Sequence, residues 1–426
     1  MTTYQNWAKN YTYNANKWEE PDTIEQMKEV VKQNNKLRVV GSRHSFNDIA
    51  DSEETMISLQ KFNRVIGLDR EHLTVTVEAG IIYSDLSHYL QQNGFALQNM
   101  ASLPHISVAG ACATATHGSG NQNSNLSTSI REMEVISSTD EIVTFSREKN
   151  EQEMNGGAAV SLGGLGVIIK LTLDIVPTFD IKQNVYENLA FNELEDNFDN
   201  IFSSAYSVSL FTDWKDDTFN YAWLKHAITA DTDSTEAAST FYGATLAMEK
   251  RHPIPGIGGA EHCTDQLGIA GPWLDRLPHF RMDFTPSNGQ ELQSEYILDR
   301  SHAYQALKAI SLIRAEIASL LQISEIRTIA KDNLWMSSCY KQDSVAIHFT
   351  WKDDWESVQK VLPKIEEALA PFNARPHWGG KLFTMEPKQV QSLYEKLPDF
   401  QKLLQQYDPQ GKFRNKFMND YIFSNQ

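Results

Sequence analysis

Two short segments carry acidic and basic side chains at the spacing of a β-strand. In SEIRTI, strand alternation would place Glu325 and Arg327 on one face, about 6.6 Å apart along the strand. In VAIHFTW the apolar residues would share one face, and His348 and Thr350 would share the other. Either pair alone is typical of a solvated sheet face. Two neighbouring strands that both carry such a pair predict a polar pocket in which acid and base chemistry is possible.

A third candidate for chemistry is His44, which lies in the segment VVGSRHSFND. The apolar start predicts a strand that ends in a turn at Gly41, and such a turn leaves convergent backbone N–H groups that suit a phosphate. Arg43 would add a positive charge nearby. The neutral imidazole of His44 is a nucleophile that could form a covalent bond with an electrophilic cofactor carbon. The alternative for this segment alone is a surface turn with an incidental histidine.

The hydrophobic pattern predicts the elements that position these residues. Asp22 and Glu25 resemble a capping box ahead of apolar residues at helical spacing, whereas LTVTVE alternates as a strand does. We expect helices at residues 22–34, 83–93 and 356–369, and strands at residues 37–40, 56–59, 73–78, 206–214, 220–224, 323–329 and 345–351. This order of short helices and strands favours an α+β fold.

Two segments are rich in small residues. In ASLPHISVAGACATATHGSG, residues 101–120, large side chains are nearly absent, so the backbone could lie against a flat ligand. The alternative is a tightly packed loop. In SLGGLGVIIKLTLDIVP, residues 161–177, the glycines precede a predicted strand. A Rossmann dinucleotide loop opens a helix instead, so that interpretation is rejected.

Length and composition limit the class of protein. A chain of 426 residues favours two domains, or one large domain with an insertion. The net charge of −17 disfavours nucleic acid and anionic membrane surfaces as partners. No apolar run approaches a membrane span, and the first twenty residues lack the charged and apolar regions of a secretory signal, so we expect a cytoplasmic protein. Cys112, Cys263 and Cys339 are widely spaced and are expected to be reduced thiols.

Several familiar catalytic signatures are absent from the sequence. It contains no GxSxG, HExxH or GxxxxGK[ST] motif. Neighbouring pairs such as Glu261 and His262 lack the spacing of a metal site, so no catalytic metal is expected.

Five motifs together resemble one family. GSRHSF, SLPHISVAGACATATHG, SLGGLG, RPHWGGK and YDPQGKFRNKF occur in the order found in flavoprotein oxidases of the vanillyl-alcohol oxidase type, in the branch of sugar-lactone and alditol oxidases. The resemblance covers essentially the whole chain. It implies a two-domain α+β fold, with a PCMH-type FAD-binding domain at residues 1–178 and a substrate or cap domain with an antiparallel sheet at residues 179–375. Residues 376–426 would return to the FAD-binding domain, and a change in composition near Pro177 agrees with this division.

The resemblance also implies how FAD is held. His44 would carry the flavin covalently through its 8α position. The pyrophosphate would lie against Gly41, Ser42, Arg43 and Ser45. The remaining contacts implied along the cofactor are Ser102, Ser107, Gly110, Thr114, Ala115, Thr116 and His117, with Gly163 and Ile168 at the adenine half and His377 near the flavin.

For the substrate, the family pattern falls on Ser102, Gln293, Glu325, Arg327, His348, Thr350 and Lys381. Among the catalytic roles that it implies, His348 would be the base and Arg327 would stabilise alkoxide charge. Glu325 would orient Arg327 and a substrate hydroxyl, and Lys381 would offset negative charge on the reduced flavin. The motif usually read as HWGK is one glycine longer here, with Gly379 and Gly380, which leaves the placement of Lys381 open by one residue.

The expected reaction is oxidation of the C1 hydroxyl of alditols such as xylitol and sorbitol to the aldose, with FAD as cofactor and O2 as acceptor, giving H2O2. A polar pocket suits a polyol because every hydroxyl needs a partner. One alternative is an oxidase or dehydrogenase of gulono- or galactono-lactone. Another is a flavin- or sugar-binding protein without turnover. We expect a monomer whose partners are the small-molecule substrate and O2.

Overall fold

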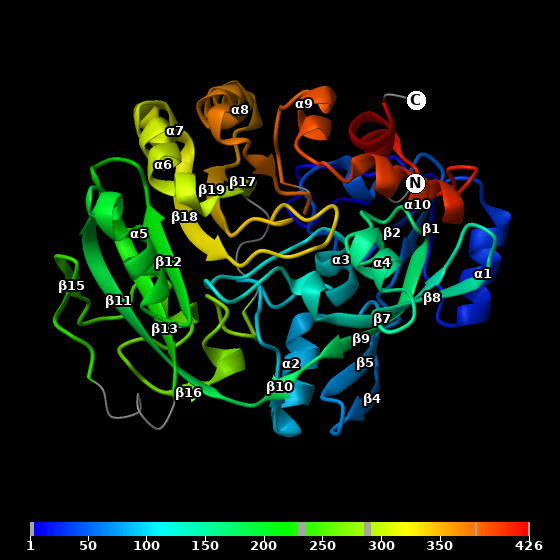
Figure 1. Ribbon diagram of the computed structural model, residues 1–426, viewed down its shortest axis with the longest axis horizontal. Helices are drawn as coiled ribbons and strands as arrows, with labels where there is room; N and C mark the ends of the chain where they lie inside the picture. The colour runs from blue at the N-terminus through cyan, green and yellow to red at the C-terminus, as the bar shows by residue number, and fades with distance from the viewer. Residues whose placement is uncertain (1–3, 229–235, 285–290, 380, 425–426) are drawn as a thin grey trace.

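The computed structural model describes residues 4–228, 236–284, 291–379 and 381–424, and two antiparallel sheets dominate this part of the chain (Figure 1). The larger sheet has ten strands, of which nine run in the order β14-β15-β11-β13-β12-β18-β19-β17-β20, with β16 paired to β11. Its strands are β11 (Asp180–Ala190), β12 (Ser207–Thr212), β13 (Thr218–Ala227), β14 (Thr240–Phe241), β15 (Ala244–Leu246), β16 (Gly271–Pro272), β17 (Glu291–Asp299), β18 (Leu321–Ile329), β19 (Ser344–Lys352) and β20 (Arg375–Pro376).

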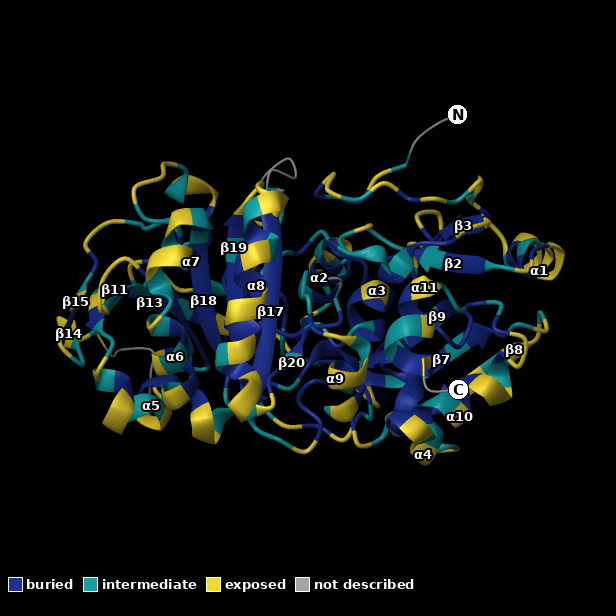
Figure 2. Ribbon diagram, turned by 90° about the horizontal axis from the view of Figure 1, so that it is seen from above, coloured by how far each residue is buried: buried dark blue, intermediate teal, exposed yellow. Residues whose placement is uncertain are grey.

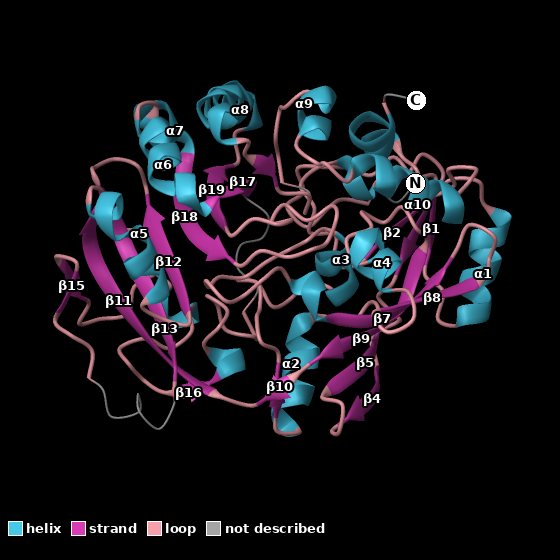
Figure 3. Cartoon of the chain, in the orientation of Figure 1, coloured by secondary structure: helices cyan, strands magenta, loops and turns pink. Residues whose placement is uncertain are grey.

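The smaller sheets lie in the N-terminal part of the chain (Figure 3). The five-stranded sheet runs β4-β5-β9-β7-β8, with bounds Val65–Asp69, Thr74–Glu78, Val167–Asp174, Ile130–Ile136 and Ile142–Ser146. A three-stranded parallel sheet joins β1 (Lys17–Glu19), β3 (Thr55–Ser58) and β2 (Leu37–Val40). A two-stranded antiparallel sheet joins β10 (Val176–Pro177) and β6 (Phe95–Ala96). Mixed helices and antiparallel sheets confirm the predicted α+β class.

The helices flank these sheets. Their bounds are α1 (Ile24–Gln33), α2 (Tyr83–Gln92), α3 (Val108–Ala113), α4 (Glu151–Glu153), α5 (Glu193–Ser203), α6 (Ala303–Ser311), α7 (Arg314–Leu320), α8 (Trp355–Leu369), α9 (Pro387–Ser392), α10 (Leu397–Tyr407) and α11 (Lys416–Met418). Each predicted helix and strand is present, with ends that shift by a few residues. The cap of α1 differs, however, from the predicted one. Thr23 is the N-cap and accepts a bond from Gln26 N, while the backbone N–H of Asp22 donates to the Gln26 side chain.

The two faces of the large sheet have opposite character. Helices α5, α6, α7 and α8 cover one face, and their exposed sides look outward (Figure 2). On that face Ile326, Ile347 and Phe349 are buried against apolar residues of α8 such as Leu362 and Ile365. Strand alternation then turns the intervening polar residues to the opposite face, which looks toward the N-terminal part of the chain. This packing is what positions the candidate site.

The C-terminal segment packs against the N-terminal part. Phe400, Phe413 and Phe417 belong to the same hydrophobic core as α1 and the five-stranded sheet. Arg38 on β2 is buried and donates to Phe413 O at 2.9 Å. Gly166, directly before β9, needs to be glycine because its φ is 140° and a Cβ would lie 2.2 Å from Ile136 O. None of the helices in the described ranges is long and apolar enough to cross a membrane.

Candidate active site

A cavity of about 520 Å³ lies between the polar face of the large sheet and loops of the N-terminal part. Most of the residues predicted for the site line it. They are Gly41, Ser42, Arg43, His44, Ser45, Ser102, Ser107, Gly110, Thr114, Thr116, His117, Gly163, Gln293, Glu325, Arg327, His348, Thr350, His377 and Lys381. Ala115 and Ile168 do not line this cavity. Both side chains are buried in the hydrophobic core, and their predicted contacts with a cofactor stay predictions.

The loop after β2 presents His44 to the cavity. Its Nε2 is buried and has no hydrogen-bond partner among the described residues. The ring stacks on Trp7, with centroids 4.3 Å apart, and lies 5.0 Å from the ring of His105. Burial lowers the pKa of His44 well below its ordinary value, and His105 and Lys381 lower it further. His44 therefore keeps the neutral form that a nitrogen nucleophile requires.

In the rest of this loop, the backbone at Gly41 and Ser42 lies close to Ser107. A Cβ on Gly41 would lie 1.8 Å from Ser107 Oγ, and Ser42 Oγ accepts a bond from Ser107 N at 3.1 Å. Arg43 has a positive φ of 58°, which is uncommon outside glycine. Its guanidinium contacts Gln5 O at 3.4 Å and lies over the ring of Trp18. The positive charge predicted for a phosphate is thus engaged with the N-terminal segment.

The predicted polar pairs on β18 and β19 do share the cavity face. In the strand register Glu325 lies opposite His348, and His348 lies opposite Glu295 on the other side of β19. Gln293 lies opposite Thr350 in the same way. The structure therefore brings both predicted pairs together and adds a third strand, β17, to the site.

Glu295 is the group that sequence reasoning missed. Its carboxylate is 2% exposed and accepts a bond from Arg327 Nη2 at 2.6 Å. Oε2 lies 3.7 Å from Nδ1 of His348, and Oε1 lies 3.4 Å from Nε2 of His117. Arg327 can reach Glu295 because Ala346, its neighbour in the register of β19, is small. The signal was available, since Gln293 and Glu295 alternate in ELQSEYILD as strand residues on one face do.

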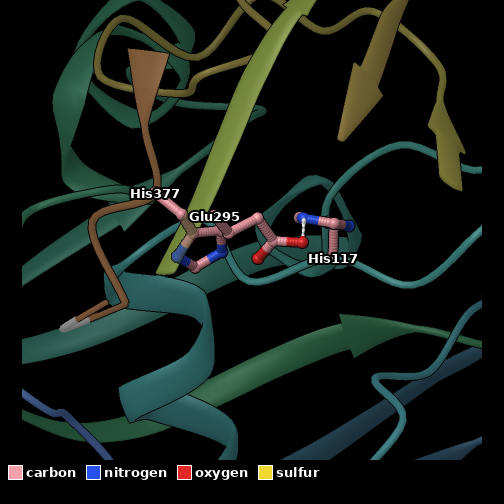
Figure 4. A group of neighbouring side chains, drawn as sticks. All are labelled: His117, Glu295 and His377. Atoms are coloured by element: carbon pink, nitrogen blue, oxygen red, sulfur yellow. Dashed lines mark ion pairs between the residues drawn. The ribbon is translucent and has the colours of Figure 1, made fainter. Parts of the chain in front are cut away.

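His117, Glu295 and His377 form a buried cluster from three distant segments (Figure 4). Their potential ligand atoms all lie within 4.8 Å of one another, so the cluster has the residue types of a metal site, which the sequence did not predict. Protein groups already use several of these atoms. Glu295 accepts from Arg327, and Nδ1 of His377 accepts from Gly379 N at 2.8 Å. We therefore describe the cluster as a buried charge network.

The ionisation of the two carboxylates is fixed by their neighbours. Burial alone raises the pKa of Glu295, but the charges of His117 and Arg327 outweigh it, and the pKa lies well below its ordinary value. Burial likewise opposes the charged form of Glu325, and Arg327 and His279 reverse that effect, so its pKa is lowered. Both groups are carboxylates at neutral pH.

The pKa values of His348 and Lys381 are also lowered, which for a basic group favours the neutral form. Burial lowers the pKa of His348, Lys381 lowers it further, and Glu295 partly opposes the shift. Nε2 of His348 lies 3.2 Å from Thr350 Oγ1. Burial lowers the pKa of Lys381 to about 8, and its ammonium donates to Gln293 Oε1. Gly380, the additional glycine before it, lies outside the described residues. Lys381 nevertheless reaches the predicted substrate-binding group Gln293.

The comparisons with known proteins agree on one family. A model described as FAD binding domain matches residues 19–146, and one described as D-arabinono-1,4-lactone oxidase matches residues 285–421. The chain is 42% identical over 424 residues to an alditol oxidase of Streptomyces sp., covering 99% of both chains. It is 25% identical to the L-gulonolactone oxidase of Mus musculus, covering 99% of this chain and 98% of that protein.

Solved structures show the same fold at low sequence identity. Cholesterol oxidase from B. sterolicum superposes with a TM-score of 0.75 at 13% identity, covering 99% of this chain and 96% of that one. A glucooligosaccharide oxidase from Acremonium strictum gives a TM-score of 0.74 at 13% identity, covering 96% and 93%. The chain therefore belongs to the FAD-dependent flavoprotein oxidases of the vanillyl-alcohol oxidase type, in the branch that contains the alditol and sugar-lactone oxidases.

Proposed function

We propose that this protein oxidises the C1 hydroxyl of alditols such as xylitol and sorbitol to the aldose, and that O2 is the acceptor and is reduced to H2O2. The observation that carries the proposal is the polar face of β17, β18 and β19, which lines the cavity with paired donors and acceptors. Sequence identity of 42% to an alditol oxidase, over 99% of the chain, supports the same substrate class.

Across the cavity from β17, β18 and β19, the loop after β2 and Ser107 offer residues that fit FAD. The turn at Gly41, the close approach of Ser107 and the unpartnered Nε2 of His44 form a narrow cradle with a nucleophile at one end. Bound there, FAD would supply the acceptor for a hydride from C1 and the transfer of two electrons to O2. We propose that His44 holds it covalently at the 8α position, as the neutral ring allows. A glucooligosaccharide oxidase of the same fold is described with an 8α-histidyl FAD.

His348 is placed to take the proton of the substrate hydroxyl. Its ring is neutral at physiological pH because burial lowers its pKa. Nδ1 faces the Glu295 carboxylate at 3.7 Å, which orients the ring and balances the charge when Nε2 gains a proton. Arg327 then stabilises negative charge on the alkoxide oxygen, and the carboxylates of Glu295 and Glu325 hold its guanidinium in place.

The remaining polar groups favour an open-chain polyol. Ser102, Gln293 and Thr350 line the cavity and offer both donors and acceptors, and Lys381 adds a positive charge. A substrate that lacks matching hydroxyls would leave these groups unpaired, which costs binding energy. The match of residues 285–421 to a lactone oxidase model keeps aldonolactones as the second candidate.

Peroxide release across a substrate panel tests this proposal. Purified protein would be assayed with xylitol and sorbitol and, in parallel, with L-gulono-1,4-lactone and D-arabinono-1,4-lactone. We expect kcat/KM for at least one alditol to exceed that for every lactone by tenfold or more, on the order of 1.4 kcal/mol of selectivity. Equal or greater turnover of a lactone would contradict the assignment.

Three further proposals concern the domain division, the cellular location and the oligomeric state. We propose that residues 1–178 and 376–426 form the FAD-binding domain and residues 179–375 the substrate domain, because one hydrophobic core joins the first two segments and a second core lies in the third. We further propose that the protein is a cytoplasmic monomer. Light scattering of the purified protein and fractionation of the source cells would check the last two points.

A further inference from the structure

A fully buried lysine, which the proposed mechanism does not use, lies on the same face of the large sheet as Arg327. Lys225 is on β13, which β12 separates from β18, and its residue is 1% exposed. Burial of an ammonium group is unfavourable unless its N–H donors find acceptors. The hydrogen-bond acceptors around Lys225 therefore show which groups its ammonium can position.

Three acceptors face the Lys225 side chain. Nζ donates to Leu277 O at 2.6 Å and to Pro278 O at 3.0 Å, and it lies 3.3 Å from Nδ1 of His279. An ammonium carries three donors, so the three acceptors match it. Because Nζ is the donor, Nδ1 of His279 accepts, and the proton of the neutral ring stays on Nε2.

His279 links this lysine to the cavity. Its Nε2 lies 2.7 Å from Oε1 of Glu325, so a proton on Nε2 makes a hydrogen bond to a carboxylate. The other carboxylate oxygen, Oε2, lies 3.6 Å from Nε of Arg327. The backbone N–H of His279 also donates to Ser102 O at 3.4 Å. Lys225, His279 and Glu325 thus form one continuous chain of polar contacts, of which His279 and Glu325 line the cavity.

The charges around Lys225 are compatible with the ammonium form. Burial lowers the pKa of Lys225 to about 7, and the Glu325 carboxylate opposes that shift. The titratable and charged groups that face it are His279, Glu325, Arg327, Arg276 and Cys263. A neutral amine has only two N–H donors and would leave one of the three acceptors unpaired, which favours the charged form.

We propose that Lys225 and His279 are positioning residues for substrate recognition. Lys225 holds the proton of His279 on Nε2, and His279 holds one oxygen of Glu325 so that the other faces Arg327 and a hydroxyl of the substrate. This inference rests on the proposed function, because it concerns polyol binding at the same site. It predicts that loss of the His279 donor acts mainly on KM.

The test compares two substitutions of His279 in the holoenzyme with xylitol as substrate. Gln offers an acceptor oxygen and a donor nitrogen without titrating, whereas Leu offers neither. We expect H279L to raise KM by about tenfold or more with a smaller change in kcat, and H279Q to stay within about threefold of wild type. Flavin content and the melting temperature would show that both variants are folded.

Two further variants define the role of Lys225. K225M should resemble H279L in KM, whereas K215M, at an exposed lysine between β12 and β13, should behave as wild type. Equal KM values for H279L, H279Q and wild type would overturn the inference, and so would equal losses in the two His279 variants. If K225M does not fold, the KM values of H279L and H279Q still test the proposed role of His279. A wild-type protein that turns over lactones but no polyol would contradict the proposed function instead.

Discussion

Glu295 and His348 face each other across the paired strands β17 and β19, with Oε2 of the carboxylate 3.7 Å from Nδ1 of the imidazole. The same carboxylate accepts a bond from Arg327 at 2.6 Å. One buried acid therefore orients both the proposed base and the proposed alkoxide-stabilising group. Glu295 is therefore the residue through which the positions of His348 and Arg327 are linked.

Substitution of Glu295 by Gln should lower kcat for xylitol by roughly a hundredfold, because a positioned general base contributes about that factor or more. The amide would leave Arg327 without its charged partner and would no longer balance a protonated His348. Steady-state kinetics and flavin content would measure the effect. E187Q is the matched control, since Glu187 on β11 pairs with Arg251 outside that strand and both side chains are partly exposed. Unchanged kcat in folded E295Q would rule out this role.

Substitution of His44 by Ala should release the cofactor from the denatured protein. Acid precipitation of wild type should leave the flavin in the pellet, whereas H44A should leave it in the supernatant, because the variant lacks the imidazole nitrogen proposed to form the bond. H72A, at an exposed histidine beside Asp69, should behave as wild type. Free flavin in the wild-type supernatant would disprove the covalent bond.

Substitution of Gly41 by Ala should reduce flavin content. The added Cβ would lie 1.8 Å from Ser107 Oγ and 2.6 Å from Ser107 Cβ, so the loop after β2 or Ser107 has to move. G67A is a matched control on β4, because a Cβ there meets nothing within 4 Å. The ratio of flavin absorbance to protein absorbance measures the result, and equal ratios in the two variants would contradict a role of this turn in holding FAD.

The pH dependence of kcat/KM should be bell-shaped. His348 accepts a proton only when neutral, and its pKa is lowered, so activity should fall on the acid side below its ordinary value of about 6.5. Lys381 has a lowered pKa of about 8, so it is charged below that pH and loses its charge above it. K381R keeps the charge and should remove the alkaline limb near pH 8. If the alkaline limb is unchanged in K381R, that limb reports the titration of a group other than Lys381.

The sequence predicted the strands of the site because their alternation is strong. The segments around Glu325 and His348 carry apolar residues on one face, and helix α8 covers that face in the structure. Glu295 was missed although its strand shows the same alternation, since the resemblance pointed only to Gln293.

Other features depend on contacts that no local pattern records. His117, Glu295 and His377 lie in three distant segments and meet only when the large sheet packs against the N-terminal loops. His279 and Lys225 are 54 residues apart, and their contact depends on how residues 277–279 return to the sheet. Arg43 carries the charge that a phosphate would need, yet its side chain contacts Gln5 and lies over Trp18.

The most direct test of the account is anaerobic addition of xylitol or sorbitol to the purified flavoprotein, followed by flavin absorbance. The polar face of β17, β18 and β19 predicts that at least one alditol bleaches the flavin, and that admission of O2 restores the colour with release of H2O2. An absorbance that stays unchanged with both alditols, in protein that retains its flavin, would contradict the proposed polyol oxidation.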